Sequence, residues 1–336
     1  MSSIGIVADH DAPGRKASTV KLRATPTPYS TMHDPIDVAS TNFLSNLPEN
    51  HITRTWKNFH LLGQAANEVF NILQENSLAG NQFIIVHGLD KHAIEKFASD
   101  ENVKLLGGIR YRFALEGVVG VIKIVPSGGH ERSTDDFTRM MDKVFFTVGF
   151  SSKANYSWAG ATRHSGTTPN SEKEPDQCLF PAALRPTVNK SNGWPTLVFE
   201  TGVSESLPRL QADSCWWFRN SGGMTRFVII ITIRRQTQKI IVQKWQLAPV
   251  ESPNPITKAY IEHLKQTNPM PPLLPQPIQS QHAFCSREVG ITVTPQGTTV
   301  TGAPMLLQSE ALFDVPNRPD ILLDTAFFAE WARDLF

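Results

Sequence analysis

The sequence is poor in several features that define common classes of protein. Its 336 residues include three cysteines, Cys178, Cys215 and Cys285, and none of them forms a Cys-x-x-Cys pair. Because the cysteines are scattered and odd in number, a disulfide framework and a structural zinc site are both disfavoured. We therefore expect an intracellular protein, cytoplasmic or nuclear. The chain also has little net charge, since 32 lysine and arginine residues nearly balance 31 aspartate and glutamate residues. Any phosphate-binding site must then be local.

Long hydrophobic runs and common catalytic motifs are missing as well. The longest strongly apolar run, residues 227–233, is too short to cross a membrane, and residues 1–16 lack the order of a signal peptide. We therefore expect no membrane partner. The chain has no Walker loop, no HExxH and no GxSxG motif. Their absence disfavours the common NTPase, zinc-protease and serine-hydrolase classes.

With 40% hydrophobic and 19% charged residues, the chain can bury a large core. Residues 1–45 are rich in Ser, Thr and Pro without apolar periodicity, which predicts a mobile N-terminal arm. Apolar residues at helical spacing predict a helix over residues 52–73. A short strand at 83–86 and a helix at 91–98 would complete a small helical and αβ extension over residues 46–105.

Residues 106–248 have the pattern of an α/β core with a mixed sheet. A hairpin is expected around Glu116-Gly117, followed by a helix with a regular apolar stripe and by a long polar loop. A further strand, a helix starting near Ser206 and two more strands follow. The expected elements are strands 111–115 and 118–125, helix 130–148, loop 151–173, strand 196–200, and strands 226–233 and 239–245.

The remaining chain divides into two parts. Residues 249–281 contain eight prolines, which predicts a largely extended connection. A proline-rich docking segment is the less favoured alternative for such unpatterned prolines. A hairpin over 288–303 and a closing helix over 325–336 suggest that residues 282–336 pack on the core.

The strongest chemical signal is a pair of carboxylates, Asp176 and Glu200. Asp176 follows Pro175, and Glu200, the last residue of a predicted strand, lies 24 residues after Asp176. Two carboxylates on neighbouring strands can supply the oxygen ligands that Mg²⁺ prefers, leaving other positions for water and a phosphate. A metal held there would lower the pKa of its bound water and neutralise charge on the phosphate. Neither carboxylate alone is informative.

Residues 116–245 resemble the PD-(D/E)XK restriction-endonuclease-like superfamily, in particular a family abundant in cyanobacteria and related fungal proteins. The resemblance implies a mixed, largely four-stranded central sheet with flanking helices, and it implies Asp176 and Glu200 as ligands of Mg²⁺ or Mn²⁺. It does not extend to residues 1–80. The motif pieces that carry it are Val125-Pro126-Ser127, His130-Glu131, Lys173-Glu174-Pro175-Asp176 and residues 195–206.

Three positions around this motif are weaker or differ from the pattern. The superfamily places a lysine two residues after the acidic residue, where this chain has Gly202, and residues 207–214 contain no lysine. Arg209 is the nearest cation, and it is either a phosphate clamp or a solvated helix charge. Glu131 is either a third acidic ligand or an ordinary residue of a first helical turn.

The leading hypothesis is a divalent-metal-dependent nuclease that acts weakly on nucleic acid, with DNA preferred over RNA and with a homodimer allowed. The alternative is an inactive nuclease fold that serves as a binding or scaffold protein. A basic stripe made by Arg226, Arg234, Arg235, Lys239 and Lys244 would favour nucleic acid, but a scattered solvated surface is favoured over it. Trp216 and Trp217 are expected in the core.

Overall fold

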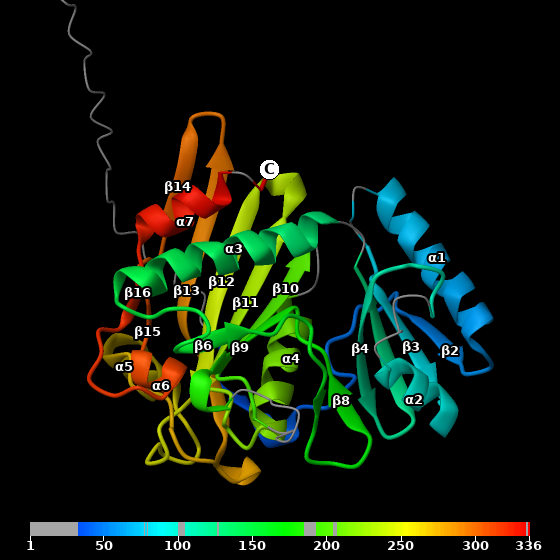
Figure 1. The fold of residues 1–336 in the computed structure, drawn as a ribbon, viewed down its shortest axis with the longest axis horizontal. Helices are drawn as coiled ribbons and strands as arrows, with labels where there is room; N and C mark the ends of the chain where they lie inside the picture. Colours follow the sequence, from blue (N-terminus) through cyan, green and yellow to red (C-terminus); the bar gives the residue numbers. More distant parts are fainter. Residues whose placement is uncertain are drawn as a thin grey trace, which may run out of the picture. The chain divides into compact units, whose positions relative to one another are not determined.

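Two mixed β-sheets and their covering helices make up the computed structural model (Figure 1). It describes residues 33–76, 78, 80–99, 105–125, 128–184, 193–203, 207–333 and 335–336, and for residues 128–131 only the backbone. All of them belong to one unit, Met32–Phe336. The mixed α/β fold class predicted from the sequence is confirmed.

The larger sheet has eight strands within the described residues, in the order β1-β13-β12-β11-β10-β9-β6, with β14 paired to β13. β10 is parallel to β11, whereas β9, β12 and β13 run antiparallel to their neighbours. The strands are β1 (Ile36–Asp37), β6 (Tyr156–Trp158), β9 (Gln177–Pro181), β10 (Leu197–Val203), β11 (Phe227–Arg234), β12 (Lys239–Leu247), β13 (His282–Thr294) and β14 (Gly297–Thr301).

The smaller sheet has six described strands in the order β2-β3-β5-β4-β8-β7. The predicted hairpin of residues 111–125 lies here, between β3 and β8, so this hairpin does not extend the sheet that carries Glu200. The strands are β2 (Ile52–Thr55), β3 (Phe83–His87), β4 (Tyr111–Glu116), β5 (Val119–Ile124), β7 (His164–Ser165) and β8 (Ser171–Lys173). A separate pair is formed by β15 (Met305–Leu307) and β16 (Ile321–Leu323).

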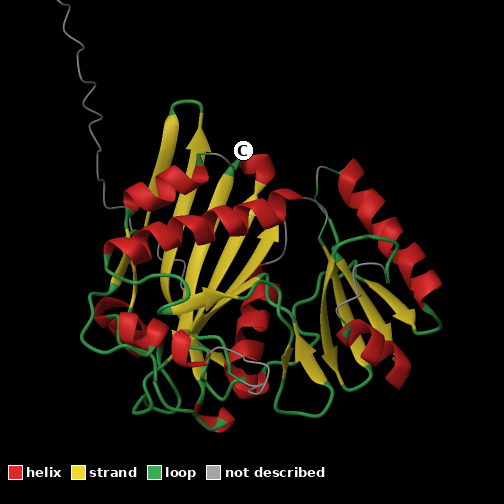
Figure 2. Ribbon diagram, in the orientation of Figure 1, coloured by secondary structure: helices red, strands yellow, loops and turns green. Residues whose placement is uncertain are grey.

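Helices cover both sheets, and α3 runs across the strands of the larger one (Figure 2). Their bounds are α1 (Phe59–Glu75), α2 (Lys91–Ala98), α3 (Gly128–Thr147), α4 (Leu207–Asn220), α5 (Lys258–Thr267), α6 (Ser309–Phe313) and α7 (Thr325–Ala332). Helices α1 and α2 share an apolar core with β3, β4 and β5. Residues 46–125 therefore form a layered unit around the smaller sheet.

Alternation along β10 sends its side chains to two different cores. Leu197, Phe199 and Val203 pack with the apolar stripe of α3 and with α7. Val198 packs with α4 instead, where Trp217 is fully buried. Glu200 has the parity of Val198, so it lies on the α4 side of the sheet.

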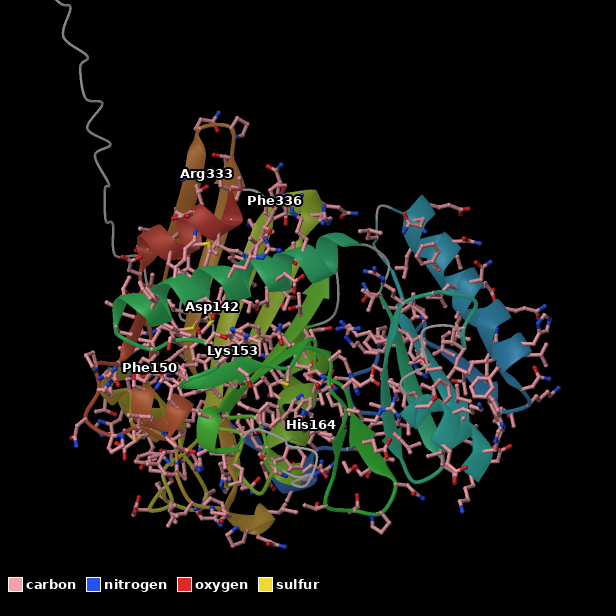
Figure 3. The ribbon with its side chains drawn as sticks, in the orientation of Figure 1. Asp142, Phe150, Lys153, His164, Arg333 and Phe336 are labelled. Atoms are coloured by element: carbon pink, nitrogen blue, oxygen red, sulfur yellow. The ribbon has the colours of Figure 1, made fainter. Side chains whose placement is uncertain are left out.

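Helix α3 is tied to the edge of the larger sheet by a partly buried carboxylate. Asp142 (Figure 3) accepts hydrogen bonds from the Tyr156 hydroxyl at 2.6 Å and from Trp158 Nε1 at 2.8 Å. Because Tyr156 is buried, its hydroxyl needs such a partner. These bonds fix α3 over β6, the edge strand that pairs with β9.

Three sequence expectations are corrected by the structure. Residues 33–45 are not a loose arm, because β1 pairs with β13 and Val38 is fully buried; residues 1–32 lie outside the described residues. The proline-rich region contains α5, which occupies a proline-free stretch and begins after Thr257, whose side chain caps it. The polar stretch 151–173 contains three short strands, because β6 pairs with β9 and β8 pairs with β4 and β7.

Candidate functional site

The two predicted carboxylates lie on adjacent strands. Asp176 directly precedes β9, and its backbone N–H donates to the Phe199 carbonyl oxygen at 3.1 Å. β9 stops pairing with β10 at Gln177↔Phe199, so the next peptide of β10 has no strand beside it. The Asp176 side chain fills this place, with Oδ2 accepting the Thr201 N–H at 2.8 Å. Its carboxylate thus lies at the open edge of the strand, whereas Glu200 faces α4.

The rest of the β10 edge is closed by side chains of the smaller sheet. Lys123 on β5 donates to the Thr201 carbonyl oxygen at 2.7 Å, and its Nζ lies 3.5 Å from Asp176 Oδ2. Gln82, just before β3, donates to the Val203 carbonyl oxygen at 2.7 Å. Buried backbone groups need such partners. The two sheets are therefore joined by polar side chains that replace a missing strand.

Glu200 is enclosed by polar partners and by α4. Its Oε1 accepts the indole N–H of Trp217 at 2.6 Å and lies 3.5 Å from Lys173 Nζ. Its side chain is 4% exposed. Burial, helped by the nearby charges of Asp213 and Asp176 and opposed by Lys173, raises the pKa of Glu200 to about 7. At neutral pH this carboxyl is divided between its protonated and charged forms.

Asp213 on α4 completes the cluster and behaves differently. Its Oδ1 lies 2.7 Å from Lys173 Nζ and 2.8 Å from an Arg209 Nη atom. Burial alone would raise the pKa of Asp213, but the Arg209 and Lys173 charges outweigh burial and lower it below its usual value. Glu200 shares Lys173 but has no guanidinium of its own. Asp213 therefore holds its negative charge more firmly than Glu200 does.

Arg209 is neither a solvated helix charge nor open to a phosphate. Its side chain is 3% exposed. Besides Asp213, its guanidinium donates to the carbonyl oxygens of Phe43 at 2.8 Å and of Ser45 at 3.0 Å. These bonds attach the chain before β2 to α4, which is a structural task.

Charge balance and space decide whether a divalent cation fits beside Glu200. Each carboxylate has at least one cationic partner within 3.5 Å. The acids are Asp176, Glu200, Asp213 and the buried Glu174, and the cations are Arg112, Lys123, Lys173, Arg209 and Arg163. The cavity beside Glu200, which Glu174 also lines, measures about 20 Å³, room for about one water molecule. Within the described residues, no group of three or more His, Cys, Asp or Glu side chains could hold a metal. The residues around Glu200 do not fit Mg²⁺ or Mn²⁺.

A roomier cavity lies on the other side of Asp176. It measures about 230 Å³ and is lined by Asp176, Arg112, Gln177, and Thr134 and Asp135 of α3. The Thr134 hydroxyl lies 2.9 Å from the Thr201 hydroxyl, which holds this turn of α3 against β10. Two carboxylates and one guanidinium therefore face a space large enough for a small ligand.

Glu131, the proposed third acidic ligand, belongs to α3 one turn before Asp135. Its side chain lies outside the described residues, as does that of His130. The proposed role of Glu131 therefore stays a prediction.

Sequence reasoning missed the role of three residues of this cluster. Lys123 has the opposite parity to the buried Ile122 and Ile124 on β5, which places its charge on the second face of a covered strand. Lys173 directly precedes the Glu-Pro-Asp motif, and Asp213 lies four residues after Arg209 on α4. The sequence offered one signal for these roles, namely that each charged residue stands in a segment that is otherwise largely buried.

Two residues of the proposed basic stripe are buried and cannot belong to a basic surface. Arg226 is 2% exposed and donates to the Gly223 carbonyl oxygen at 2.9 Å. Lys244 is fully buried and donates to Asn268 Oδ1 and the Leu306 carbonyl oxygen, each at 2.8 Å. Burial of Trp216 and Trp217 is confirmed.

Comparisons with known proteins are sparse. No protein-family model matches the chain, and no curated protein matches it significantly. Among solved structures, the chain is similar to a DUF820 protein from Anabaena variabilis ATCC 29413 that is described as a candidate nuclease. The match covers 66% of this chain and 90% of the other, with 12% identity and a TM-score of 0.35. None of the helices in the described residues is both long and apolar enough to cross a lipid bilayer.

Proposed function

We propose that this chain is a nuclease-fold protein that no longer hydrolyses phosphodiesters and acts by binding. Two features support the nuclease ancestry. Strands β6, β9, β10 and β11 are neighbours with both antiparallel and parallel pairing, and α3 and α4 pack on opposite faces of β10. Asp176 directly precedes β9 and Glu200 lies on the adjacent strand β10, which is the chain order that the PD-(D/E)XK resemblance implies.

The loss of hydrolysis rests on one observation, the ion cluster around Glu200. Lys173 lies against Glu200 and Lys123 against Asp176, so the acidic pair is already neutralised by the protein's own ammonium groups. A divalent cation would enter a buried site whose acids are already paired with cations, where repulsion from those cations is weakly screened. A phosphodiester could not enter the 20 Å³ space beside Glu200.

A second candidate, metal-dependent cleavage of nucleic acid, is favoured by the cavity next to Asp176. There Asp176 and Asp135 could offer oxygen ligands to Mg²⁺ or Mn²⁺, which would supply an activated water. For this, the Asp176 carboxylate has to exchange Lys123 and Arg112 for the metal. DNA as the preferred partner, the metal and a homodimer all remain predictions, and the burial of Arg226 and Lys244 removes part of the support for nucleic acid.

The two candidates are separated by a cleavage assay with a binding readout. The purified full chain is incubated with plasmid, single-stranded DNA and RNA in Mg²⁺ or Mn²⁺, beside Asp176→Ala and the surface control Asp34→Ala. We expect no cleavage above background by any of the three proteins, and no calorimetric signal that depends on Asp176. Cleavage by the unaltered chain and by Asp34→Ala, lost in Asp176→Ala, would establish the nuclease instead.

A further inference from the structure

We propose that the groove between β2 and α1 binds an extended peptide of acidic and apolar residues as an added strand. The groove belongs to the smaller sheet and lies outside the nuclease-like part. This inference therefore does not depend on the proposed function.

The first support is the open edge of β2. This strand is the last of its sheet and pairs in parallel with β3. The Trp56 N–H donates to the His87 carbonyl oxygen at 2.8 Å, so by alternation the peptide groups of Thr53 and Thr55 point away from β3. No strand in the described part of the chain pairs with that side. Such an edge offers N–H and C=O groups at the spacing of an extended backbone. The Thr53 carbonyl oxygen accepts a hydrogen bond from Arg54 Nη1 at 3.1 Å, which a ligand strand would replace.

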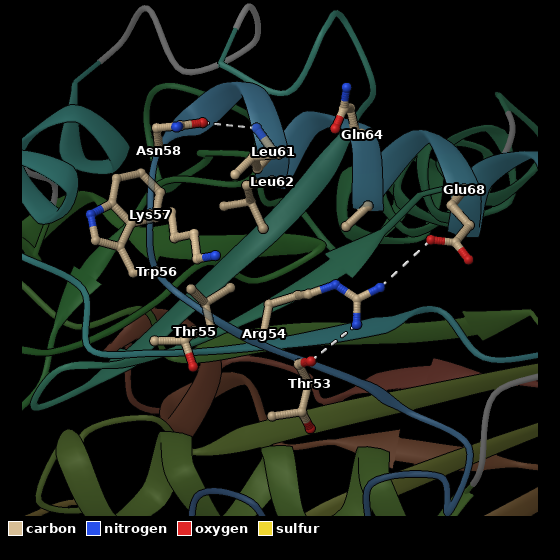
Figure 4. A pocket seen from close by; sticks show the side chains of 12 residues that line it. Thr53, Arg54, Thr55, Trp56, Lys57, Asn58, Leu61, Leu62, Gln64 and Glu68 are labelled. Atoms are coloured by element: carbon tan, nitrogen blue, oxygen red, sulfur yellow. Dashed lines mark hydrogen bonds and ion pairs between the residues drawn. The ribbon is translucent and has the colours of Figure 1, made fainter.

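The second support is a cavity that runs along this edge (Figure 4). It measures about 480 Å³, within the range of about 300–1,000 Å³ typical of ligand sites. Thr53 and Thr55 line it from the strand, and Leu61 and Ala65 line it from α1. Leu61 is 45% exposed, an apolar surface that a ligand would cover. A strand laid along β2 would therefore contact the helix with every second side chain.

The third support is the charge at the groove. Two cationic side chains, Arg54 and Lys57, line the groove, and Glu68 is the one acidic side chain among its described lining residues. Arg54 lies on the same face of β2 as Ile52, which packs against the core. Arg54 Nη2 lies 3.6 Å from Glu68 Oε2 in an exposed pair, which water already weakens. A ligand carboxylate can take the place of Glu68. The occupant is therefore a strand with an acidic residue two positions from an apolar one, both facing α1.

The test uses a capped peptide, Thr-Glu-Thr-Val-Thr-Glu-Thr, at millimolar concentration with the full chain. Amide hydrogen exchange should slow at least tenfold at Thr53 and Thr55 when the peptide is bound. The same peptide with N-methylated backbone amides keeps its side chains but cannot pair with a strand, so it should not bind. A version with Lys in place of Glu should bind at least tenfold more weakly.

Matched variants locate the binding on the groove. Leu61→Asp should weaken binding at least tenfold, whereas Ile72→Asp should leave it unchanged. Ile72 is 44% exposed on the same helix but does not line the cavity. Unchanged exchange at Thr53 and Thr55, equal binding of the N-methylated peptide, or equal effects of the two variants would overturn the proposal. Protection that rises with protein concentration in the absence of peptide would do so as well, since it would assign the edge to a second copy of the chain.

Discussion

The ammonium group of Lys123 lies 2.7 Å from the carbonyl oxygen of Thr201, and these two residues belong to different sheets. The contact occurs where β10 loses its neighbour β9, so a side chain supplies the hydrogen bond that a strand would otherwise provide. The same ammonium group faces Asp176. One lysine thus joins the two sheets and neutralises the carboxylate that a nuclease would use for its metal.

Removing this lysine should destabilise the protein strongly. Lys123→Met leaves the Thr201 carbonyl without this donor and leaves Asp176 with Arg112 at 3.4 Å as its remaining cationic partner in the cluster. Breaking a buried ion pair from one side costs about 3–5 kcal/mol, so the free energy of unfolding should fall by about that amount. Urea denaturation measures it.

The control for this experiment is an exposed lysine that also forms an ion pair with a carboxylate. Lys91 is 91% exposed and lies 3.7 Å from Glu95, so Lys91→Met should change stability by less than about 1 kcal/mol. Adding Asp176→Asn to Lys123→Met should recover part of the loss, because it removes the charge of a buried carboxylate that has lost one of its two cationic partners. Equal effects of Lys91→Met and Lys123→Met would show that the contact between the sheets is weak.

Glu200 should make stability depend on pH between about 4.5 and 7. Its pKa is raised from 4.5 to about 7 in the folded protein, so in this interval the folded state holds a proton that the unfolded chain has lost. The free energy of unfolding therefore decreases as pH rises through the interval. The contribution is fully present below about pH 4.5 and is lost above pH 7. Its size is on the order of 3 kcal/mol at most.

Glu200→Gln removes the titration and keeps an oxygen for Trp217. Relative to the unaltered chain, this variant should gain stability as pH rises from 5 to 8, as followed by denaturation at each pH. Glu95→Gln, at a glutamate that is 63% exposed, is the matched control and should keep the original pH profile. A Glu200→Gln profile parallel to that of the unaltered chain would contradict the assignment.

Local sequence pattern was sufficient for much of the fold. The helix at Lys91–Ala98 was predicted with its observed bounds, and in the structure the Asp90 side chain caps it. The hairpin turns where Gly117 adopts a positive φ of 63°, as the Glu-Gly pair predicted. Such features depend on residues that are close in sequence, so a single chain segment is enough to predict them.

The ion cluster could not be predicted in this way. Lys173 meets Asp213 only because β8 pairs with β4 while α4 packs on β10, and these are long-range arrangements. The residues that line up with the nuclease motif, Asp176 and Glu200, were found from the sequence. Lys123 comes from β5, outside that motif, and Lys173, although it stands in the motif piece beside Asp176, meets Glu200 only through long-range packing, so the sequence could not show that the acids are paired.

Arg209 should prove to be an anchor for the segment before β2. Arg209→Met removes the donors to Phe43 and Ser45, while Asp213 keeps Lys173. We expect a loss of about 2–4 kcal/mol in stability and faster amide exchange over residues 41–46. Arg132→Met, at an arginine that is 68% exposed, should change neither quantity. A loss of nucleic-acid affinity without faster local exchange would restore the phosphate role.

Gly202→Lys tests whether placing a lysine at the motif position brings about metal-dependent cleavage. From the sequence alone, this change is expected to raise metal-dependent cleavage. In the structure, Gly202 is a buried residue of β10 paired in register with Thr232, and by alternation it shares the α4 side with Glu200. A lysine there would bring a further ammonium group to a cluster whose acids are already paired with cations.

The expected outcome is therefore a less stable protein that still does not cleave. Gly202→Met adds a side chain of comparable length without charge, so its stability measures the steric cost alone. Gly202→Lys should be less stable than Gly202→Met by about 2 kcal/mol or more, because an additional buried charge lacks a partner. Urea denaturation of both variants and a plasmid assay in Mg²⁺ or Mn²⁺ provide the measurements. If the lysine variant is as stable as the methionine variant and cleaves DNA, then the cations of the cluster do not block metal binding. The single substitution Gly202→Lys would then be sufficient for nuclease activity.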